Sequence, residues 1–391
     1  MNLSDSDDEF FDAIDDSIPP PPTPDLNSLQ STKGSTSLRP AKELSTGSLK
    51  SSELLFTDLC TNSTQLCESG RVGERMLPYA VGLVAVEVRA NKKDYREFEG
   101  LKLAQEVFCC RDCSVLRTKF SPDGRFLSVS CDSGVVYLYE VTRGRSAEQG
   151  FPLLKPQPYQ TFQEHTGPVV DLAWEHSSTY ILSAGLDALV LLWRVDSPAY
   201  LFRFPHPASV TSVSFHPLIP SLFATGSLDS NVRLWSTQDQ REVQYYPCGE
   251  SITALAYSPK GQELYVGVRL GEVLVLGAEG QGQVMKEVKR LRCRNRRGFK
   301  SGGRKVTGIE FFEESCREFA DDNCLISTND SRARLFVNQE MTQKYKGHKS
   351  EEHTIRLSFS HNSLHVLSGS ENGTVYIWNL HNSYVPNINP K

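Results

Sequence analysis

The sequence predicts an all-β fold built from a repeated unit, and three observations support this. Six times along the chain, a short apolar run ends in Trp or another bulky apolar residue a few residues after a turn. Around each turn, apolar and polar residues alternate with the period that is typical of half-buried strands. Three of the five gaps between successive turns measure about 40 residues, and the other two hold insertions. The turns fall at Asp132, Asp187, Asp229, Leu270, Asp330 and Asn372.

The repeated unit is expected to form four short strands. In the clearest copy, an outer strand at 200–204 precedes a strand at 210–215, and two further strands flank the turn at Asp229. Units of four short strands arranged around an axis are the blades of a β-propeller. The six recognisable repeats therefore predict a β-propeller over residues 101–380, followed by a short C-terminal tail at 381–391.

The way in which the ring closes is left open by the sequence. Six repeats fit a six-bladed ring, an open ring that lacks its seventh blade, or a truncated sequence of a seven-bladed ring. In the first case, the strand expected at 101–108 would add the outer strand beside 376–379. A further blade would need about 30 residues after Trp378, more than the sequence provides there.

The repeats resemble WD repeats, in which four polar positions form a hydrogen-bonded network. The matching residues are His165, Ser183, Asp187 and Trp193 in the second copy, His206, Thr225, Asp229 and Trp235 in the third, and Trp378 in the last. A buried Asp accepts from imidazole and backbone, and the Trp N–H finds a hydroxyl partner, so these residues are expected to be structural. The fourth copy departs from this pattern, with Leu270 at the Asp position, and is expected to rely on packing.

Catalysis is not expected, although His, Ser and Asp together look like a hydrolase triad. The sequence contains no glycine-rich phosphate loop and no nucleophile elbow. Cys109, Cys110 and Cys113 have no second Cys or His pair at ligand spacing, so neither a metal nor another cofactor is expected. The sequence predicts a chain that stays in the cytosol, with reduced cysteines and without a transmembrane segment.

Residues 1–70 are expected to form a disordered tail, because they are rich in Ser, Thr, Asp and Pro and carry few aromatic residues. Within the tail, residues 4–15 resemble the FFAT motif, which docks on VAP proteins of the endoplasmic reticulum. The matching residues are Glu9, Phe10, Phe11, Asp12 and Ala13, with Asp15 in place of the final Glu. Ser4 and Ser6 each precede an acidic residue by three positions, and their phosphorylation would add charge. The alternative is a solvated acidic tail with two incidental Phe residues.

A proline run at 19–24 should adopt the polyproline II conformation. It would act as a stiff spacer or as the ligand of an SH3-domain protein, and no Arg or Lys flanks it to fix an orientation. Thr23 precedes a proline and is a candidate phosphorylation site.

A basic run spans residues 286–305, where ten Lys or Arg residues accompany the single acidic residue Glu287. The cations proposed to contact anionic lipid are Arg292, Arg294, Arg296, Arg297 and Lys300. A solvated loop and a protein contact are the alternatives. Nucleic acid is not expected, because Phe299 is the only aromatic residue that could stack on a base.

The order of parts resembles a rabphilin-like WD-repeat protein, a family that binds the Rab GTPase of recycling endosomes. Beyond the tail motif, the stretches that carry the resemblance are 303–310, 327–335, 344–347 and 368–378. The resemblance implies that residues 71–100 contact GTP-bound Rab. The alternative for residues 79–89 is a strand that joins the edge of the ring.

The resemblance implies a non-catalytic adaptor of membrane traffic. Such a protein would be cytoplasmic and peripheral on endosomal, Golgi and endoplasmic-reticulum membranes. The alternative function is a general scaffold, or a substrate receptor of a ubiquitin-ligase or nuclear complex, which is a common use of WD-repeat rings.

Overall fold

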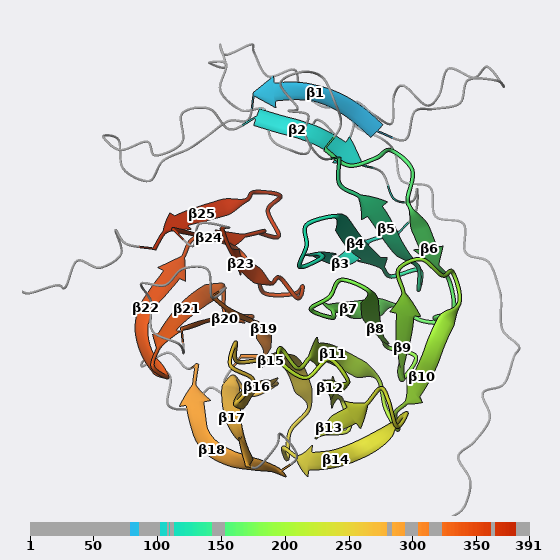
Figure 1. The fold of residues 1–391 in the computed structure, drawn as a ribbon. Helices are drawn as coiled ribbons and strands as arrows, with labels where there is room; N and C mark the ends of the chain where they lie inside the picture. Colours follow the sequence, from blue (N-terminus) through green and yellow to red (C-terminus); the bar gives the residue numbers. More distant parts are fainter. Residues whose placement is uncertain are drawn as a thin grey trace, which may run out of the picture. The chain divides into compact units, whose positions relative to one another are not determined.

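The computed structural model describes residues 79–85, 102–107, 109, 113–142, 153–279, 284–293, 304–312, 323–360 and 364–380. The chain divides into two compact units, 1–53 and 54–391, and all described residues belong to the second. The regular elements that the structure describes are strands, numbered β1 to β25 (Figure 1). The expected disordered tail at 1–70 and the C-terminal tail at 381–391 lie outside the described residues.

Six antiparallel sheets follow one another along the chain and form the blades of a six-bladed β-propeller (Figure 1). Blade 1 holds β3 (Val115–Phe120), β4 (Phe126–Cys131), β5 (Val136–Glu140) and β6 (Gln160–Phe162). Blade 2 holds β7 (Val169–Trp174), β8 (Tyr180–Gly185), β9 (Leu189–Arg194) and β10 (Tyr200–Pro205). Blade 3 holds β11 (Val210–Phe215), β12 (Leu222–Ser227), β13 (Asn231–Ser236) and β14 (Arg241–Pro247).

The last three blades repeat the same strand order, and the described residues of blade 6 form three strands, whereas each other blade has four. Blade 4 holds β15 (Ile252–Tyr257), β16 (Glu263–Val268), β17 (Glu272–Glu279) and β18 (Val284–Arg292). Blade 5 holds β19 (Val306–Phe311), β20 (Cys324–Thr328), β21 (Arg332–Val337) and β22 (Glu340–Lys346). Blade 6 holds β23 (Leu357–Phe359), β24 (His365–Ser368) and β25 (Tyr376–Asn379). The all-β propeller expected from the repeats is confirmed.

The hydrophobic core consists of layers between neighbouring blades. Between blades 1 and 2, Leu138 packs in one cluster with Leu172 and Trp193, and all three side chains are buried. Between blades 5 and 6, Leu325 and Leu335 pack with Leu357 in the same way. Each fully buried apolar side chain of this size contributes about 1.5–3 kcal/mol. A blade is therefore stabilised mainly by the blade on either side of it.

The seam between blade 6 and blade 1 lacks such a layer among the described residues. Phe120 on β3 is 60% exposed, although Trp174 and Phe215 at the equivalent positions of β7 and β11 are each 8% exposed. On the other side of the seam, Val375 is 60% exposed, whereas the equivalent Ala333 of blade 5 is fully buried. Both faces of the seam therefore present apolar side chains without a described blade against them.

β2 (Lys102–Val107) pairs antiparallel with β1 (Tyr79–Ala85) in a two-stranded sheet of its own. The expectation that this segment would pair with β25 is therefore wrong. The side chain of Gln105 explains where β2 lies instead, because its amide bonds both the carbonyl and the N–H of Leu154, at 3.0 and 2.8 Å. Val107 packs against buried residues of blade 1. These contacts hold β2 to the first blade.

Candidate functional site

The polar network expected in the second repeat is complete in blade 2. His165 Nδ1 lies 2.9 Å from a carboxylate oxygen of Asp187, and its Nε2 lies 2.7 Å from Ser183 Oγ. The indole N–H of Trp193 donates to the same hydroxyl at 2.8 Å. A serine that is shared between a histidine and a buried tryptophan has no position from which to attack a substrate. The network joins the strands of one blade and serves the fold.

Blade 3 uses the equivalent residues differently. His206 Nε2 and the Trp235 N–H both reach the Thr225 hydroxyl, at 2.8 and 3.0 Å, as in blade 2. Asp229, however, pairs with Arg233 at 2.6 Å, and His206 Nδ1 donates to the carbonyl of Phe204 at 3.0 Å. Burial lowers the pKa of His206 to about 4, so this imidazole is neutral at physiological pH. The fourth contact of the expected network is therefore replaced by a carboxylate–guanidinium pair.

In blade 5, Arg334 pairs with the turn residue Asp330 as Arg233 pairs with Asp229 in blade 3, a role that the sequence analysis did not predict. Its side chain is fully buried, and its guanidinium pairs with Asp330 at 2.6 Å and also donates to the Thr328 hydroxyl. The signal that could have revealed it is the recurrence of an Arg four residues after the turn Asp, as in Asp229 and Arg233. A buried pair of this kind fixes the conformation of the turn, since neither charge can be left alone.

Blade 6 carries Trp378 in an incomplete version of the network. Its indole N–H donates to the carbonyl of Lys346 at 3.2 Å, and its ring lies 5.4 Å from that of His348. His348 Nδ1 is buried without a hydrogen-bond partner in the described part of the chain. Ser368 holds the position that Ser183 holds in blade 2, but its hydroxyl donates to the carbonyl of Gly369 at 2.7 Å. Among the described residues of the last blade, no hydroxyl therefore ties histidine to tryptophan as in blades 2 and 3.

A buried carboxylate joins four blades at their innermost strands. Asp171 of β7 accepts from Ser212 Oγ at 2.7 Å and from the Val213 N–H at 3.1 Å, both on β11 of blade 3. Arg356, which directly precedes β23 of blade 6, donates to it at 2.9 Å. The Nε of Arg117 on β3 of blade 1 lies 3.3 Å away. Blades 1 and 6, which face each other across the open seam, are thus linked through one side chain.

The ionised form of Asp171 is favoured despite its burial. Burial alone would raise the pKa of this carboxyl, but Arg356, Arg117 and Lys119 together hold it below the usual value. Conversely, burial and the positive charge of Arg356 lower the pKa of Arg117. No sequence motif marks these residues, because their partners come from blades that lie far apart along the chain.

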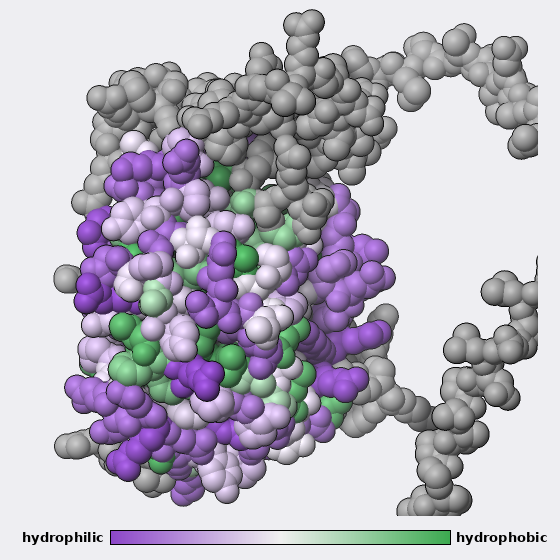
Figure 2. All heavy atoms as spheres, turned by 90° about the vertical axis from the view of Figure 1, so that its right-hand side faces the viewer, coloured by the Kyte–Doolittle hydropathy of each residue, from purple (hydrophilic) through white to green (hydrophobic). Residues whose placement is uncertain are grey.

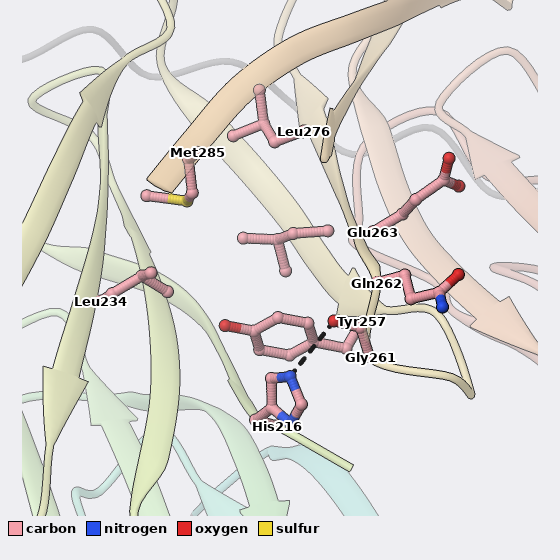
Figure 3. A pocket seen from close by; sticks show the side chains of 9 residues that line it. His216, Leu234, Tyr257, Gly261, Gln262, Glu263, Leu276 and Met285 are labelled. Atoms are coloured by element: carbon pink, nitrogen blue, oxygen red, sulfur yellow. Dashed lines mark hydrogen bonds between the residues drawn. The ribbon is translucent and has the colours of Figure 1, made fainter. Parts of the chain in front are cut away.

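A small cavity of about 10 Å³ lies between blades 3 and 4 (Figure 3). In this view, His216 Nε2 donates to the carbonyl of Gly261 at 3.1 Å, and the Tyr257 hydroxyl points toward Leu234. That hydroxyl is buried without a hydrogen-bond partner among the described residues. The space admits at most about one water molecule. It is a gap in packing and is too small to bind a ligand.

The basic run is described only in part. On β18, Arg290 pairs with Glu287 at 2.9 Å and with Glu272 at 3.3 Å. Arg292 lies 3.9 Å from Glu272, and its side chain is largely exposed. The other cations proposed to contact lipid, Arg294, Arg296, Arg297 and Lys300, lie outside the described residues.

The other proposed binding sites fall mostly on segments that the structure does not describe. The FFAT-like residues Glu9 to Asp15 and the candidate phosphorylation sites Ser4, Ser6 and Thr23 lie outside the described residues. Of the segment proposed to contact Rab, residues 71–100, the structure describes β1 alone.

The side of the propeller that carries β6 and β10 has a mixed surface (Figure 2). Hydrophobic residues appear there in small groups between hydrophilic ones. The exposed apolar side chains of β10 are Tyr200 and Leu201. Scattered groups of this kind are ordinary on protein surfaces and indicate no particular docking site.

Three further observations concern the cysteines, possible metal ligands and possible membrane-spanning helices. Cys113 is disulfide-bonded, so the expectation of reduced thiols is wrong for this residue, whereas Cys109 and Cys131 are free. Cytosolic proteins keep most of their cysteines reduced, but this is an average tendency that does not decide the state of one particular pair of thiols. Among the described residues, no group of three or more His, Cys, Asp or Glu side chains could hold a metal ion. That part of the chain also contains no helix with the length and apolar character needed to cross a membrane.

Comparison with known proteins agrees with this geometry. The family of the WD domain, G-beta repeat, matches residues 103–140, 156–194, 199–236 and 339–379. The chain is a WD-repeat protein with a β-propeller. Residues 199–236 of this match correspond to β10 followed by the first three strands of blade 3. The sequence repeat is therefore offset by one strand from the structural blade.

The chain is similar to parts of longer proteins. WD repeat-containing protein 44 of Xenopus laevis is 31% identical over 229 residues, which cover 57% of this chain and 24% of that protein. Jouberin of Mus musculus is 24% identical over 282 residues, covering 66% of this chain and 24% of its own length. The chain thus spans about a quarter of these relatives. The β-propeller domain of Cps50 (Swd1) from Myceliophteria thermophila aligns with a TM-score of 0.54 and is 17% identical in sequence. The alignment covers 69% of this chain and 83% of that domain, and the likeness shows a shared fold alone.

Proposed function

We propose that the protein is a non-catalytic adaptor of membrane traffic that binds a GTP-bound Rab and docks on VAP proteins of the endoplasmic reticulum. The observation that carries the proposal is the order of its parts. An acidic tail with the Glu9–Ala13 match to the FFAT pattern precedes a WD-repeat propeller. We expect such an adaptor to be cytoplasmic and peripheral on endosomal, Golgi and endoplasmic-reticulum membranes.

The described propeller supports the non-catalytic part of the proposal. Its His, Ser, Thr and Asp residues that look catalytic are engaged in hydrogen bonds within single blades. The apolar faces at the seam, represented by Phe120 and Val375, offer exposed surface of the kind that partner proteins cover. WD-repeat rings of this type bind other proteins through exposed loops and faces.

The contact with VAP is tested by capture of the full chain on an immobilised VAP domain. Each Phe side chain that enters a pocket gains about 1.5–3 kcal/mol, so Phe11→Ala alone should weaken binding roughly tenfold to hundredfold. The double variant Phe11→Ala/Asp12→Ala should abolish capture. A matched control, Leu26→Ala/Asp25→Ala, changes the same kinds of residue outside the motif and should bind normally. Equal capture of both double variants would refute the docking.

The contact with Rab is tested by calorimetric titration of the full chain with a recycling-endosome Rab. The Rab is loaded with a GTP analogue in one arm and with GDP in the other. Binding to the GTP form alone, lost on deletion of residues 71–78 next to β1, is the expected result. Absence of binding to either form would refute the Rab contact and would favour the general scaffold or the ubiquitin-ligase receptor.

A further inference from the structure

A basic cavity opens where blades 3, 4 and 5 meet. Its volume is about 670 Å³, and the residues that line it include Leu228, Arg269, Leu270, Arg304, Lys305 and Asn329. Arg269 and Leu270 belong to the turn between β16 and β17, and Asn329 belongs to the turn between β20 and β21. Lys305 directly precedes β19, and the N–H of Asn329 donates to its carbonyl at 2.9 Å. The cavity is thus built from turns that rigid blades hold in place.

The charge of the lining has one sign. Arg269, Arg304 and Lys305 all line the cavity, and no carboxylate does. Arg269 and Arg304 are exposed, and neither forms an ion pair in the described part of the chain. An arginine offers five donors in a planar fork that matches phosphate oxygens. The two arginines are therefore available to an anion.

Positive charge also accumulates beneath the cavity. Lys305 Nζ donates to Thr354 Oγ1 at 3.1 Å, and both burial and the charge of Arg356 lower its pKa. Arg117 and Lys119 add two more cations close to Arg356, and the side-chain ammonium of Lys119 forms no hydrogen bond or ion pair with described residues. The carboxylates that face these cations are Asp171 and Glu310. Asp171 is already occupied by Arg356, Ser212 and backbone N–H groups.

Asp171 and Glu310 therefore do not neutralise the positive charges of Arg269, Arg304 and Lys305 that line the cavity. Clefts lined by one sign of charge concentrate counter-ions, because low-dielectric walls focus the field. A single carboxylate would compensate only one of the three cations that line the cavity. The charge pattern fits a ligand that carries several negative groups.

We propose that this cavity binds a multiply phosphorylated small molecule of the inositol polyphosphate class, free or as the headgroup of a lipid. The volume lies within the range of small-molecule sites. Arg269 and Arg304 approach from two blades and would each hold one phosphate, while Lys305 provides a third positive charge in the lining. The exposed side chains of Leu228 and Leu270 border the cavity and would lie against the apolar ring edge. None of the residues that line this cavity belongs to the tail motif or to the cations proposed above to contact lipid.

The test is calorimetric titration of the full chain with inositol hexakisphosphate. Wild type should bind, and the thermal unfolding midpoint should rise with ligand concentration. The variant Arg269→Glu/Arg304→Glu should lose at least roughly tenfold in affinity, as expected when charged hydrogen bonds are removed. Both arginines are exposed, so the variant should fold, which its unfolding midpoint without ligand verifies. The matched control Arg203→Glu reverses an exposed arginine of β10 and should bind like wild type.

Flotation with vesicles separates the two sources of the ligand. One set contains phosphatidylinositol bisphosphate and the other contains phosphatidylserine at equal total charge. Selective flotation with the first set, lost in Arg269→Glu/Arg304→Glu, assigns the site to a lipid headgroup. If wild type binds inositol hexakisphosphate but does not float with either set of vesicles, the ligand of the site is a free polyphosphate. If wild type binds neither probe, or if the double variant binds as tightly as wild type, the proposal is overturned.

Discussion

Replacement of Asp171 by alanine should destabilise the whole propeller, because this side chain joins blades 1, 2, 3 and 6. The carboxylate is 2% exposed and lies 2.9 Å from Arg356 and 3.3 Å from Arg117. Removing one partner of a buried, hydrogen-bonded ion pair costs about 3–5 kcal/mol, since the remaining charge stays buried and unpaired. The variant also leaves the Val213 N–H without its acceptor. We therefore expect Asp171→Ala to lower the free energy of unfolding by about 3–5 kcal/mol.

The assay is urea unfolding followed by tryptophan fluorescence, with hydrogen exchange of individual strands as the second readout. Exchange should accelerate most in β3 and β23, the strands on either side of the seam, because Asp171 links both to blade 2. The control is Asp196→Ala, which removes an exposed carboxylate paired with Arg194 and should leave the midpoint unchanged. A free energy of unfolding for Asp171→Ala within about 0.5 kcal/mol of wild type would refute the reasoning, because surface changes commonly fall in that range.

The same side chain predicts a dependence on pH. The pKa of Asp171 is lower in the folded protein than in the unfolded chain, where a carboxyl of this type titrates near about 3.9. Its contribution is therefore present above that value and is lost as pH falls through the folded pKa. The difference in stability between wild type and Asp171→Asn should be constant near neutral pH and should shrink below pH of about 4. A difference that stays constant down to pH 2 would contradict this assignment.

Three further substitutions test the packing of single residues by urea unfolding. Arg334→Ala should cost about 3–5 kcal/mol, because it removes the fully buried guanidinium that pairs with Asp330 and donates to Thr328, and Arg334→Leu/Asp330→Asn should recover part of the loss. Tyr257→Phe should be neutral or stabilising, because the hydroxyl of Tyr257 is buried without a partner among the described residues. Tyr265→Phe should instead cost about 1.5–3 kcal/mol, because it removes the hydrogen bond to Glu263. Equal costs for the two variants would contradict this. Phe120→Ala should change stability by less than about 1 kcal/mol, against about 3–5 kcal/mol for a buried Phe, and a larger loss would show that the seam is covered.

The sequence by itself determined the blades. Short apolar runs with period two and a turn recurring at about 40 residues are local patterns, and strands with one buried face follow from them. The contacts of His165, Ser183 and Trp193 in blade 2 could be predicted for the same reason, since all three residues lie within one repeat. The departure in blade 3 depends on one residue, Arg233, which competes with His206 for Asp229.

Only the tertiary structure decided how the blades meet. Asp171 gathers partners that lie up to 185 residues away along the chain, and no periodic pattern encodes such a contact. The position of β2 beside blade 1 depends on the bonds between Gln105 and Leu154. The cavity beside Arg269 and Arg304 depends on turns from three blades. Strand formation depends on neighbours in sequence, whereas ring closure and surface sites depend on which distant side chains the closed backbone brings together.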